Sequence, residues 1–349
     1  MDYVTLFPAG TASLVAEGLR SLLPGVKVLQ SDESALSFST SARLGSADAV
    51  PFVKNLFMVR GWADRRSLDA TVADLARKVG DLRRPPGSTA FRVMYHIDGG
   101  LVACSPQVRQ GLESAISTAT SLRPEPRGHC QEYWVIGRRD WSTVYLGERL
   151  PTGRARAPSE KGSLSGELSA LLVILSRPDP RDVFIDPFAG SGSIVAARLG
   201  KPAQKVIYND LDKSIHRSVT DRLGRRPGLV VLHENGTALA SVESSGVSAI
   251  VTDPPWGEYE ESIGDYLTFA RSLAAEFARL LNPRWGRLVL LVSRRHERQM
   301  LESLAEQGFA CDPAIEILVN GHPASVLRAC PRQHQGCTPS GRASQRTVC

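Results

Sequence analysis

The stretch VFIDPFAGSGS, residues 183–193, decides the fold of this 349-residue chain. It begins with the apolar run Val183 to Ile185, which predicts a buried strand. Gly190 and Gly192 then allow a tight turn whose backbone can approach a ligand closely. A helix is expected over Ser193 to Leu199, so the turn presents backbone amides at a helix N-terminus. This order of strand, glycine turn and helix predicts a Rossmann-like α/β domain.

An acid stands directly ahead of these glycines, at Asp186. The third glycine of the G-x-G-x-x-G dinucleotide pattern is missing, and a carboxylate here would repel a pyrophosphate. The carboxylate suits instead the positively charged amino group of a methionine moiety. We therefore predict an S-adenosylmethionine loop made of Asp186, Phe188, Ala189, Gly190, Ser191 and Gly192. The alternative is a turn with a structural role alone.

Outward from this loop, strands and helices alternate between residues 164 and 330. Strands are expected at 206–208, 229–232, 249–251 and 287–292, and helices at 167–175, 213–223, 266–281 and 294–307. Two more strands, 315–319 and 325–329, would close the sheet as a hairpin. Such alternation predicts a parallel, doubly wound sheet with an antiparallel edge.

Two further sites follow the second and third of these strands. Asp210 comes just after the second strand, where a carboxylate can accept the hydroxyls of a ribose. Leu211 adjoins it, and Asp212 can cap the following helix. Asn235 and Gly236 follow the third strand, where a polar side chain could bind the adenine of the cofactor. Asn-Gly is also a frequent turn pair, so both interpretations stay open.

The motif TDPPWG, residues 252–257, ends the fourth strand and carries the predicted chemistry. The lone pair of an exocyclic base amine is delocalised into the ring, which makes the amine a poor nucleophile. The carboxylate of Asp253 and the carbonyl of Pro254 can accept its two N–H groups and so localise that lone pair. Pro254 and Pro255 stiffen the loop, and Trp256 offers a flat face for an extruded base. We predict Asp253, Pro254, Pro255 and Trp256 as the catalytic residues.

The N-terminal half is organised differently. Mixed strands and helices predict two small α+β regions, 1–55 and 56–148. Residues 149–163 have the composition of a linker, 164–330 form the α/β domain, and 331–349 are expected to be a disordered tail.

Net charge, hydropathy and cysteine content limit the partners and the location that we expect for this protein. The net charge of +6 favours a polyanionic partner, because lysine and arginine release counterions from phosphates. No apolar run is long enough to cross a bilayer, and the first residues, MDYVTLFPAG, lack the features of a secretory signal. We therefore expect a cytoplasmic protein with no membrane partner. The six cysteines contain no C-x-x-C pair, so no metal site is predicted.

The motifs at 186–193, 209–212 and 252–257 resemble those of class I S-adenosylmethionine-dependent amino-methyltransferases. They are most similar to THUMP-containing tRNA guanine-N2 methyltransferases and their 23S rRNA relatives. Residues 161–175, Lys-Gly-Ser-Leu followed by a helix, resemble the element that these enzymes place before their first strand. The resembling enzymes usually carry Tyr or Phe where Trp256 stands and often an acid where Asn235 stands. The resemblance implies a ferredoxin-like module over residues 1–55 and a THUMP-like RNA-binding module over 56–148. It further implies methylation of guanosine N2 in tRNA, with these N-terminal modules holding the RNA.

Several alternatives remain open at this point. The same motif order fits a 23S rRNA guanine-N2 methyltransferase or a DNA adenine-N6 methyltransferase. A non-catalytic RNA-binding protein with a degenerate methyltransferase fold is a further possibility, which the intact Asp186, Gly190, Gly192, Asp210 and Asp253 disfavour. Oligomeric state cannot be inferred from these residues.

Overall fold

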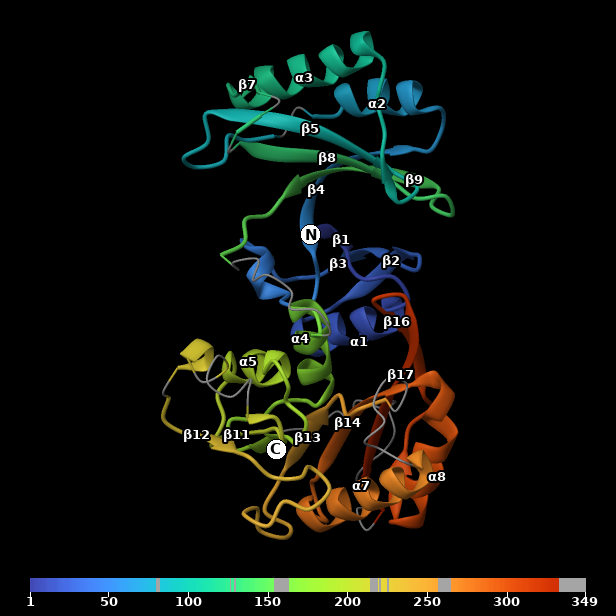
Figure 1. The fold of residues 1–349 in the computed structure, drawn as a ribbon. Helices are drawn as coiled ribbons and strands as arrows, with labels where there is room; N and C mark the ends of the chain where they lie inside the picture. The colour runs from blue at the N-terminus through green and yellow to red at the C-terminus, as the bar shows by residue number, and fades with distance from the viewer. Residues whose placement is uncertain are drawn as a thin grey trace, which may run out of the picture. The chain divides into compact units, whose positions relative to one another are not determined.

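The computed structural model forms two compact units, Met1–Arg156 and Ala157–Cys349, which Figure 1 colours from blue to green and from green to red. It describes residues 1–79, 82–125, 127–128, 130–153, 163–213, 219, 221–224, 226–256 and 265–332. The pair Lys161-Gly162, most of the helix expected at 213–223, Gly257 and most of the tail 331–349 lie outside the described residues.

The described part of the first unit contains a nine-stranded sheet in the order β2-β3-β1-β4-β9-β8-β5-β6, with β7 paired to β5. The strands are β1 (Asp2–Leu6), β2 (Lys27–Ser31), β3 (Ala35–Ser39), β4 (Asn55–Asp64), β5 (Ala90–Ile97), β6 (Gly100–Leu101), β7 (Arg123–Pro124), β8 (Gln131–Gly137) and β9 (Thr143–Arg149). β4 joins the regions 1–55 and 56–148, because its first residues pair with β1 and its later residues pair with β9. The short strands β6 and β7 were not expected from the sequence.

Two helices cover the strands β5 and β8 of this sheet. α2 (Leu68–Ala76) and α3 (Pro106–Thr120) bury their apolar stripes against β5 and β8, and Figure 1 shows both helices on one side of those strands. Pro106 begins α3, a position where the missing amide costs nothing. α1 (Ala12–Leu22) buries Leu14, Val15 and Leu19, and a short 3-10 helix, η1 (Ala47–Ala49), precedes β4.

The described part of the second unit contains an eight-stranded sheet in the order β12-β11-β10-β13-β14-β17-β15, with β16 paired to β17. The strands are β10 (Val183–Asp186), β11 (Lys205–Asn209), β12 (Leu229–Leu232), β13 (Ala249–Thr252), β14 (Arg287–Ser293), β15 (Phe309–Cys311), β16 (Ile315–Val319) and β17 (His322–Pro331). The first five in spatial order are parallel, and β17 runs antiparallel to β14 and forms the expected hairpin with β16. The sequence missed the three-residue strand β15, which pairs with β17.

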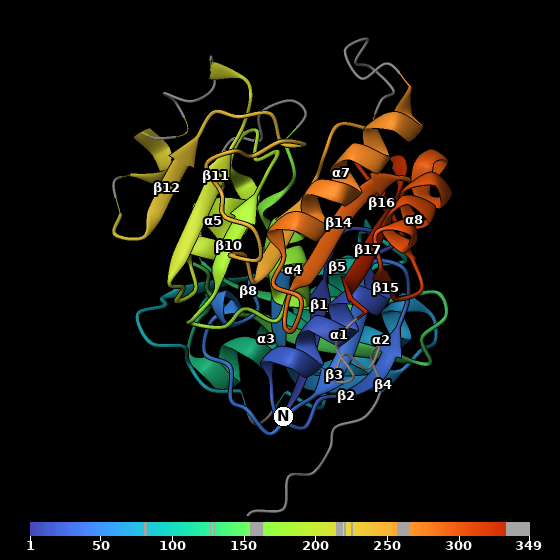
Figure 2. The ribbon, with the colours of Figure 1, turned by 90° about the horizontal axis from the view of Figure 1, so that it is seen from below.

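Helices cover both faces of this sheet. In Figure 1 the strands lie between α4 (Gly166–Leu175) and α5 (Ser193–Leu199) on one side and α7 (Tyr266–Leu280) and α8 (Glu297–Glu306) on the other, and Figure 2 shows α7 beside α8. A 3-10 helix, η3 (Arg294–His296), precedes α8. All eight residues from Leu168 to Leu175 are buried, as expected for a helix that is apolar on nearly all of its faces.

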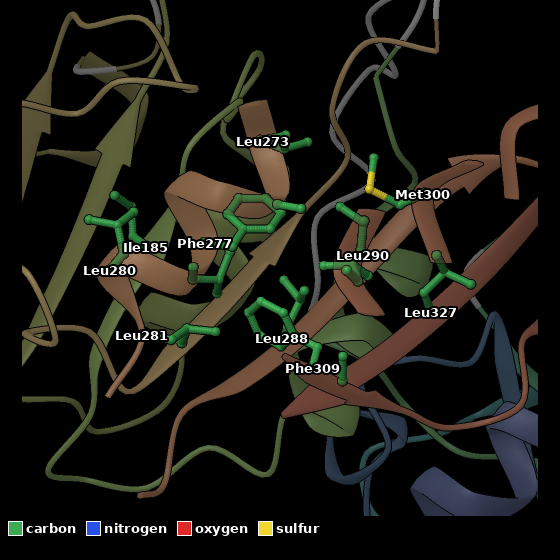
Figure 3. Close-up of a cluster of buried hydrophobic side chains, with 14 of the residues drawn as sticks. Ile185, Leu273, Phe277, Leu280, Leu281, Leu288, Leu290, Met300, Phe309 and Leu327 are labelled. Carbon is green, nitrogen blue, oxygen red and sulfur yellow. The ribbon is translucent and has the colours of Figure 1, made fainter. Parts of the chain in front are cut away.

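A cluster of buried apolar side chains packs α7 and α8 against the sheet. Phe277 and Leu280 of α7, Met300 of α8 and Ile185 and Leu288 of the strands belong to one buried cluster (Figure 3). Burying an aliphatic or aromatic side chain of this kind stabilises the fold by about 1.5–3 kcal/mol. The cluster therefore holds the carboxyl ends of β10, β13 and β14 in a fixed arrangement.

Candidate active site

The carboxyl ends of three neighbouring strands bring the predicted site residues to one edge of the sheet. β10 pairs in parallel with β11 on one side, where Ile185 lies opposite Ile207. On the other side it pairs with β13, where Ile185 lies opposite Ile250. The chain order of the strands reverses between β10 and β13. Ligands of doubly wound sheets bind at such a switch point.

The loop after β10 turns through two glycines with left-handed backbones. Gly190 has a φ of 47° and Gly192 a φ of 74°, which L side chains rarely adopt. A Cβ at Gly190 would meet no heavy atom within 4 Å, so the space beside this backbone is open. A Cβ at Gly192 would lie 3.0 Å from Cγ1 of Val219. Gly190 therefore lies beside open space that a ligand could fill. A side chain at Gly192 would instead crowd Val219.

Asp186 is the last residue of β10 and stands at the start of this loop. It is only 1% exposed, and its Oδ1 accepts the Phe188 amide at 3.3 Å. Burial raises the pKa of the Asp186 carboxyl to about 8, and the nearby charges of Asp253 and Asp210 add to the rise. A positive charge brought close to this carboxyl would reverse that shift. The electrostatics therefore fit a cationic group at the loop.

Asp210 directly follows β11, and its carboxylate accepts a hydrogen bond from the backbone of the glycine loop. Its Oδ2 accepts the Gly190 amide at 2.7 Å, and its Oδ1 accepts the Asp212 amide at 2.8 Å. Each carboxylate oxygen can accept more than one hydrogen bond, so these contacts leave capacity for hydroxyl donors. Leu211 beside it is 68% exposed. The pair thus offers a carboxylate and an apolar side chain at the same edge.

The remaining loop residues pack inward. Ala189 donates its amide to the Asn209 carbonyl at 2.9 Å, and the hydroxyls of Ser191 and Ser193 lie 2.9 Å apart. The hydroxyl of buried Tyr208 donates to the Gly190 carbonyl at 2.8 Å. These bonds hold the loop in one conformation.

Asn209 belongs to the motif 209–212, but the sequence analysis assigned it no role of its own. Its fully buried side chain donates Nδ2 to the carbonyls of Pro187 (2.8 Å) and Glu234 (2.9 Å), and its Oδ1 accepts the Glu234 amide at 2.9 Å. One side chain therefore ties together the loops that follow β10, β11 and β12. An amide residue at the end of a buried strand, just before the acid, is the signal that could have identified it.

The structure brings the predicted residues Phe188 and Gly236 into contact. A Cβ on Gly236 would lie 2.5 Å from Cζ of the Phe188 ring, so any larger residue there would force the ring to move. Asn235 is exposed, and its Oδ1 accepts the amide and the hydroxyl of Thr237, both at 3.0 Å. This turn accounts for Asn235 without a ligand, and its contact with adenine stays a prediction.

The motif after β13 places its acid and its ring side by side. Nε1 of Trp256 donates to Oδ1 of Asp253 at 2.8 Å. Pro254 is buried, whereas Asp253, Pro255 and Trp256 are each partly exposed. The motif therefore combines a rigid backbone with a carboxylate and an indole that solvent can reach.

An aromatic chain runs from the glycine loop towards the end of β14. Phe188 meets Phe269 edge to face with ring centres 6.1 Å apart, and Phe269 lies 5.9 Å from Tyr266. Tyr266 stacks on His296 with centres 3.8 Å apart. The sequence analysis singled out neither Tyr266 nor His296, because only the fold brings α7 against η3.

Two other kinds of feature, a metal site and a membrane-spanning helix, are absent from the part of the chain that the structure describes. No group of three or more His, Cys, Asp or Glu side chains there could hold a metal ion. None of the described helices combines the length and hydropathy that a membrane span requires.

Known structures share this fold over nearly the whole chain, although no family model and no curated protein matches the sequence. TrmN from Thermus thermophilus aligns with a TM-score of 0.69 at 22% identity, covering 95% of this chain and 99% of that one. A predicted N6-adenine-specific DNA methylase from Listeria monocytogenes gives 0.59 at 14% identity, covering 93% and 95%. SMU.472, a candidate methyltransferase complexed with SAH, gives 0.60 at 13%, covering 95% and 98%.

These alignments confirm the fold expected from the sequence. The chain has a Rossmann-like α/β domain of the kind found in these methyltransferases, preceded by an α+β unit. At these identities the likeness concerns the fold, and the chemistry has to be argued from the site itself.

Proposed function

We propose that this protein transfers a methyl group from S-adenosylmethionine to an exocyclic amine of a base in RNA, with guanosine N2 in tRNA as the target. One observation carries the proposal. The parallel pairing of β10 with β13 sets the glycine loop and the Asp253 motif at the same edge of the sheet. A methyl donor at the first would thus lie beside a base at the second.

The residues around β10 and β11 fit the cofactor. Open space beside Gly190 accommodates its methionine part, and the buried carboxyl of Asp186 matches its amino group. Asp210 would accept the ribose hydroxyls, and exposed Leu211 would pack on the adenine. S-adenosylmethionine supplies an electrophilic methyl group on a positively charged sulfur.

In this proposal, Asp253 and Pro254 hold the target amine and make it a better nucleophile. The carboxylate and the carbonyl accept its two N–H groups, which turns the nitrogen lone pair towards the methyl group. The nitrogen forms a bond to the methyl carbon as the carbon–sulfur bond breaks, and the nitrogen then loses one proton to water. Most of the acceleration comes from holding the two reactants in line, an effect that can supply about 7–11 kcal/mol.

The choice of RNA rests on the resemblance of the motifs to THUMP-containing tRNA methyltransferases and on the positive net charge of +6. An rRNA guanine is a second target of the same chemistry. The fold shared with a predicted N6-adenine-specific DNA methylase makes adenine N6 in DNA the competing candidate. A cytoplasmic location is part of the same proposal.

Mass spectrometry of nucleosides from a deletion strain tests the substrate. We expect N2-methylguanosine to disappear from one set of tRNAs and to return when the intact gene is restored. Loss from rRNA alone would redirect the proposal to rRNA, and loss of N6-methyladenine from DNA would reject RNA as the substrate. Purified protein with labelled S-adenosylmethionine and each nucleic acid provides the matching measurement in vitro.

A further inference from the structure

The bond between Trp256 and Asp253 gives the tryptophan a task besides stacking. The indole Nε1 donates to Oδ1 of Asp253 at 2.8 Å. This length is typical of hydrogen bonds from N–H groups to charged oxygens, which are about twice as strong as neutral ones. The ring that the sequence suggested as a platform for a base is therefore also a hydrogen-bond donor.

The identity of the aromatic residue matters for this bond. Phenylalanine has no donor, and the donor of tyrosine is a hydroxyl at the far tip of its ring. The indole N–H lies on the side of the ring, where it reaches a carboxylate three residues back in the same loop. The enzymes that this motif resembles usually carry Tyr or Phe at this position. Trp256 thus brings a contact that those side chains would not make in the same way.

We propose that Trp256 is a positioning residue whose indole N–H holds the Asp253 carboxylate in the orientation that receives the target amine. This inference rests on the proposed function. Pro254 and Pro255 already restrict the backbone of the loop. The carboxylate itself turns about a broad, two-fold torsion, and the indole bond restrains that rotation.

Stacking and the hydrogen bond use different parts of the same ring. The bond to Asp253 is made by the edge of the indole, whereas a base would stack on its face. Trp256 is only partly buried, which is compatible with a face that receives a base. A single side chain thereby orders both the base and the acceptor of its amine.

The test separates the N–H group from the ring. Trp256 is replaced at that position alone by 3-benzothienylalanine, whose sulfur stands in for the N–H group, and in parallel by Phe and by Leu. We expect kcat to fall about 10–100-fold in the first two variants, because a misplaced catalytic group costs about this much. KM for the RNA and cofactor affinity by calorimetry should stay within about threefold, since a stacking ring remains. Trp256→Leu should also raise KM.

Trp285→Phe is the matched control, because that indole is 58% exposed and precedes β14. It should leave kcat and KM unchanged. A benzothienyl or Phe variant with kcat within about twofold of the wild type would overturn the inference and leave stacking as the only role of the ring.

An NMR measurement that needs no enzymatic turnover tests the bond between Trp256 and Asp253 separately from the proposed function. In ¹⁵N-labelled protein, the indole N–H proton of Trp256 should resonate downfield and move upfield in Asp253→Ala. An unchanged resonance would overturn the positioning role even if the enzyme is active. The expected shift in a protein that binds S-adenosylmethionine but methylates no nucleic acid would instead reject the proposed function.

Discussion

The two sides of the candidate site are held by different means. On the cofactor side, Asn209 links three loops, and Asp210 and Tyr208 both bond to Gly190. On the base side, the loop after β13 is stiffened by two consecutive prolines and by the bond from Trp256 to Asp253. The first arrangement is part of the fold, so changes in it should alter stability and cofactor binding together. The second arrangement is confined to the loop after β13. Changes in it should therefore lower the rate of methyl transfer without altering stability or cofactor binding.

The largest effect is expected at Asp253. Asp253→Ala would remove one of the two acceptors proposed for the target amine and should lower the transfer rate by at least about 10³-fold. Cofactor affinity by calorimetry should stay within about fivefold, because the glycine loop is untouched. Full activity in this variant would defeat the mechanism. A joint loss of stability and cofactor affinity would erase the contrast between the two sides.

Asn209→Ala tests the opposite side. It removes the three hydrogen bonds of a buried side chain and leaves backbone groups of Pro187 and Glu234 without this partner. We expect the free energy of unfolding in urea to fall by about 3 kcal/mol, with weaker cofactor binding. Asn235→Ala is the matched control, and its exposed position predicts a loss below about 1 kcal/mol. Equal losses in the two variants would contradict the role given to Asn209.

Gly236→Ala should have a smaller effect. The added methyl would lie 2.5 Å from the Phe188 ring, so the ring must move. We expect a loss of about 2 kcal/mol in stability, in the range of overpacked cores, and weaker cofactor binding because Phe188 belongs to the glycine loop. Gly166→Ala, where a Cβ would meet nothing within 4 Å, is the control. A fully stable Gly236→Ala would show that the ring relocates freely.

Taken per pH unit, the smallest expected effect is a pH dependence caused by Asp186. Its folded pKa of about 8 lies above the value near 4 of an unfolded aspartate. Between these two values the folded state keeps a proton that the unfolded state has lost. The free energy of unfolding should therefore fall as pH rises from about 4 to 8, by about 1 kcal/mol per pH unit. Denaturation at several pH values should show this slope in the wild type and not in Asp186→Asn.

Cofactor binding provides the second measurement at this residue. Binding of a cationic amino group near Asp186 should release up to about one proton at pH 7, because the carboxyl becomes ionised. Calorimetry in buffers of different ionisation enthalpy counts that proton. Asp186→Asn should bind weakly and release none. The same proton release in the variant would assign it to another group.

The elements of the second unit were predictable because their apolar periodicity is strong. The expected strand at 183–185 and the helix at 193–199 match β10 and α5 closely. The three residues of β15 carry too little periodicity to be recognised, and only pairing with β17 makes them a strand. The first unit shows the same limit, since β6 and β7 contain two residues each.

The sequence alone determined the class of fold and the order of its loops, because glycines, prolines and buried strands have local physical requirements. It also placed Asp186, Asp210 and Asp253 at the carboxyl ends of the first, second and fourth strands of the α/β domain. Tertiary structure decided which side chains meet. Asn209 became the link between three loops, Trp256 became a donor to Asp253, and Asp186 acquired its raised pKa. Hydrogen-bond geometry and burial depend on neighbours from distant segments, and no local pattern contains them.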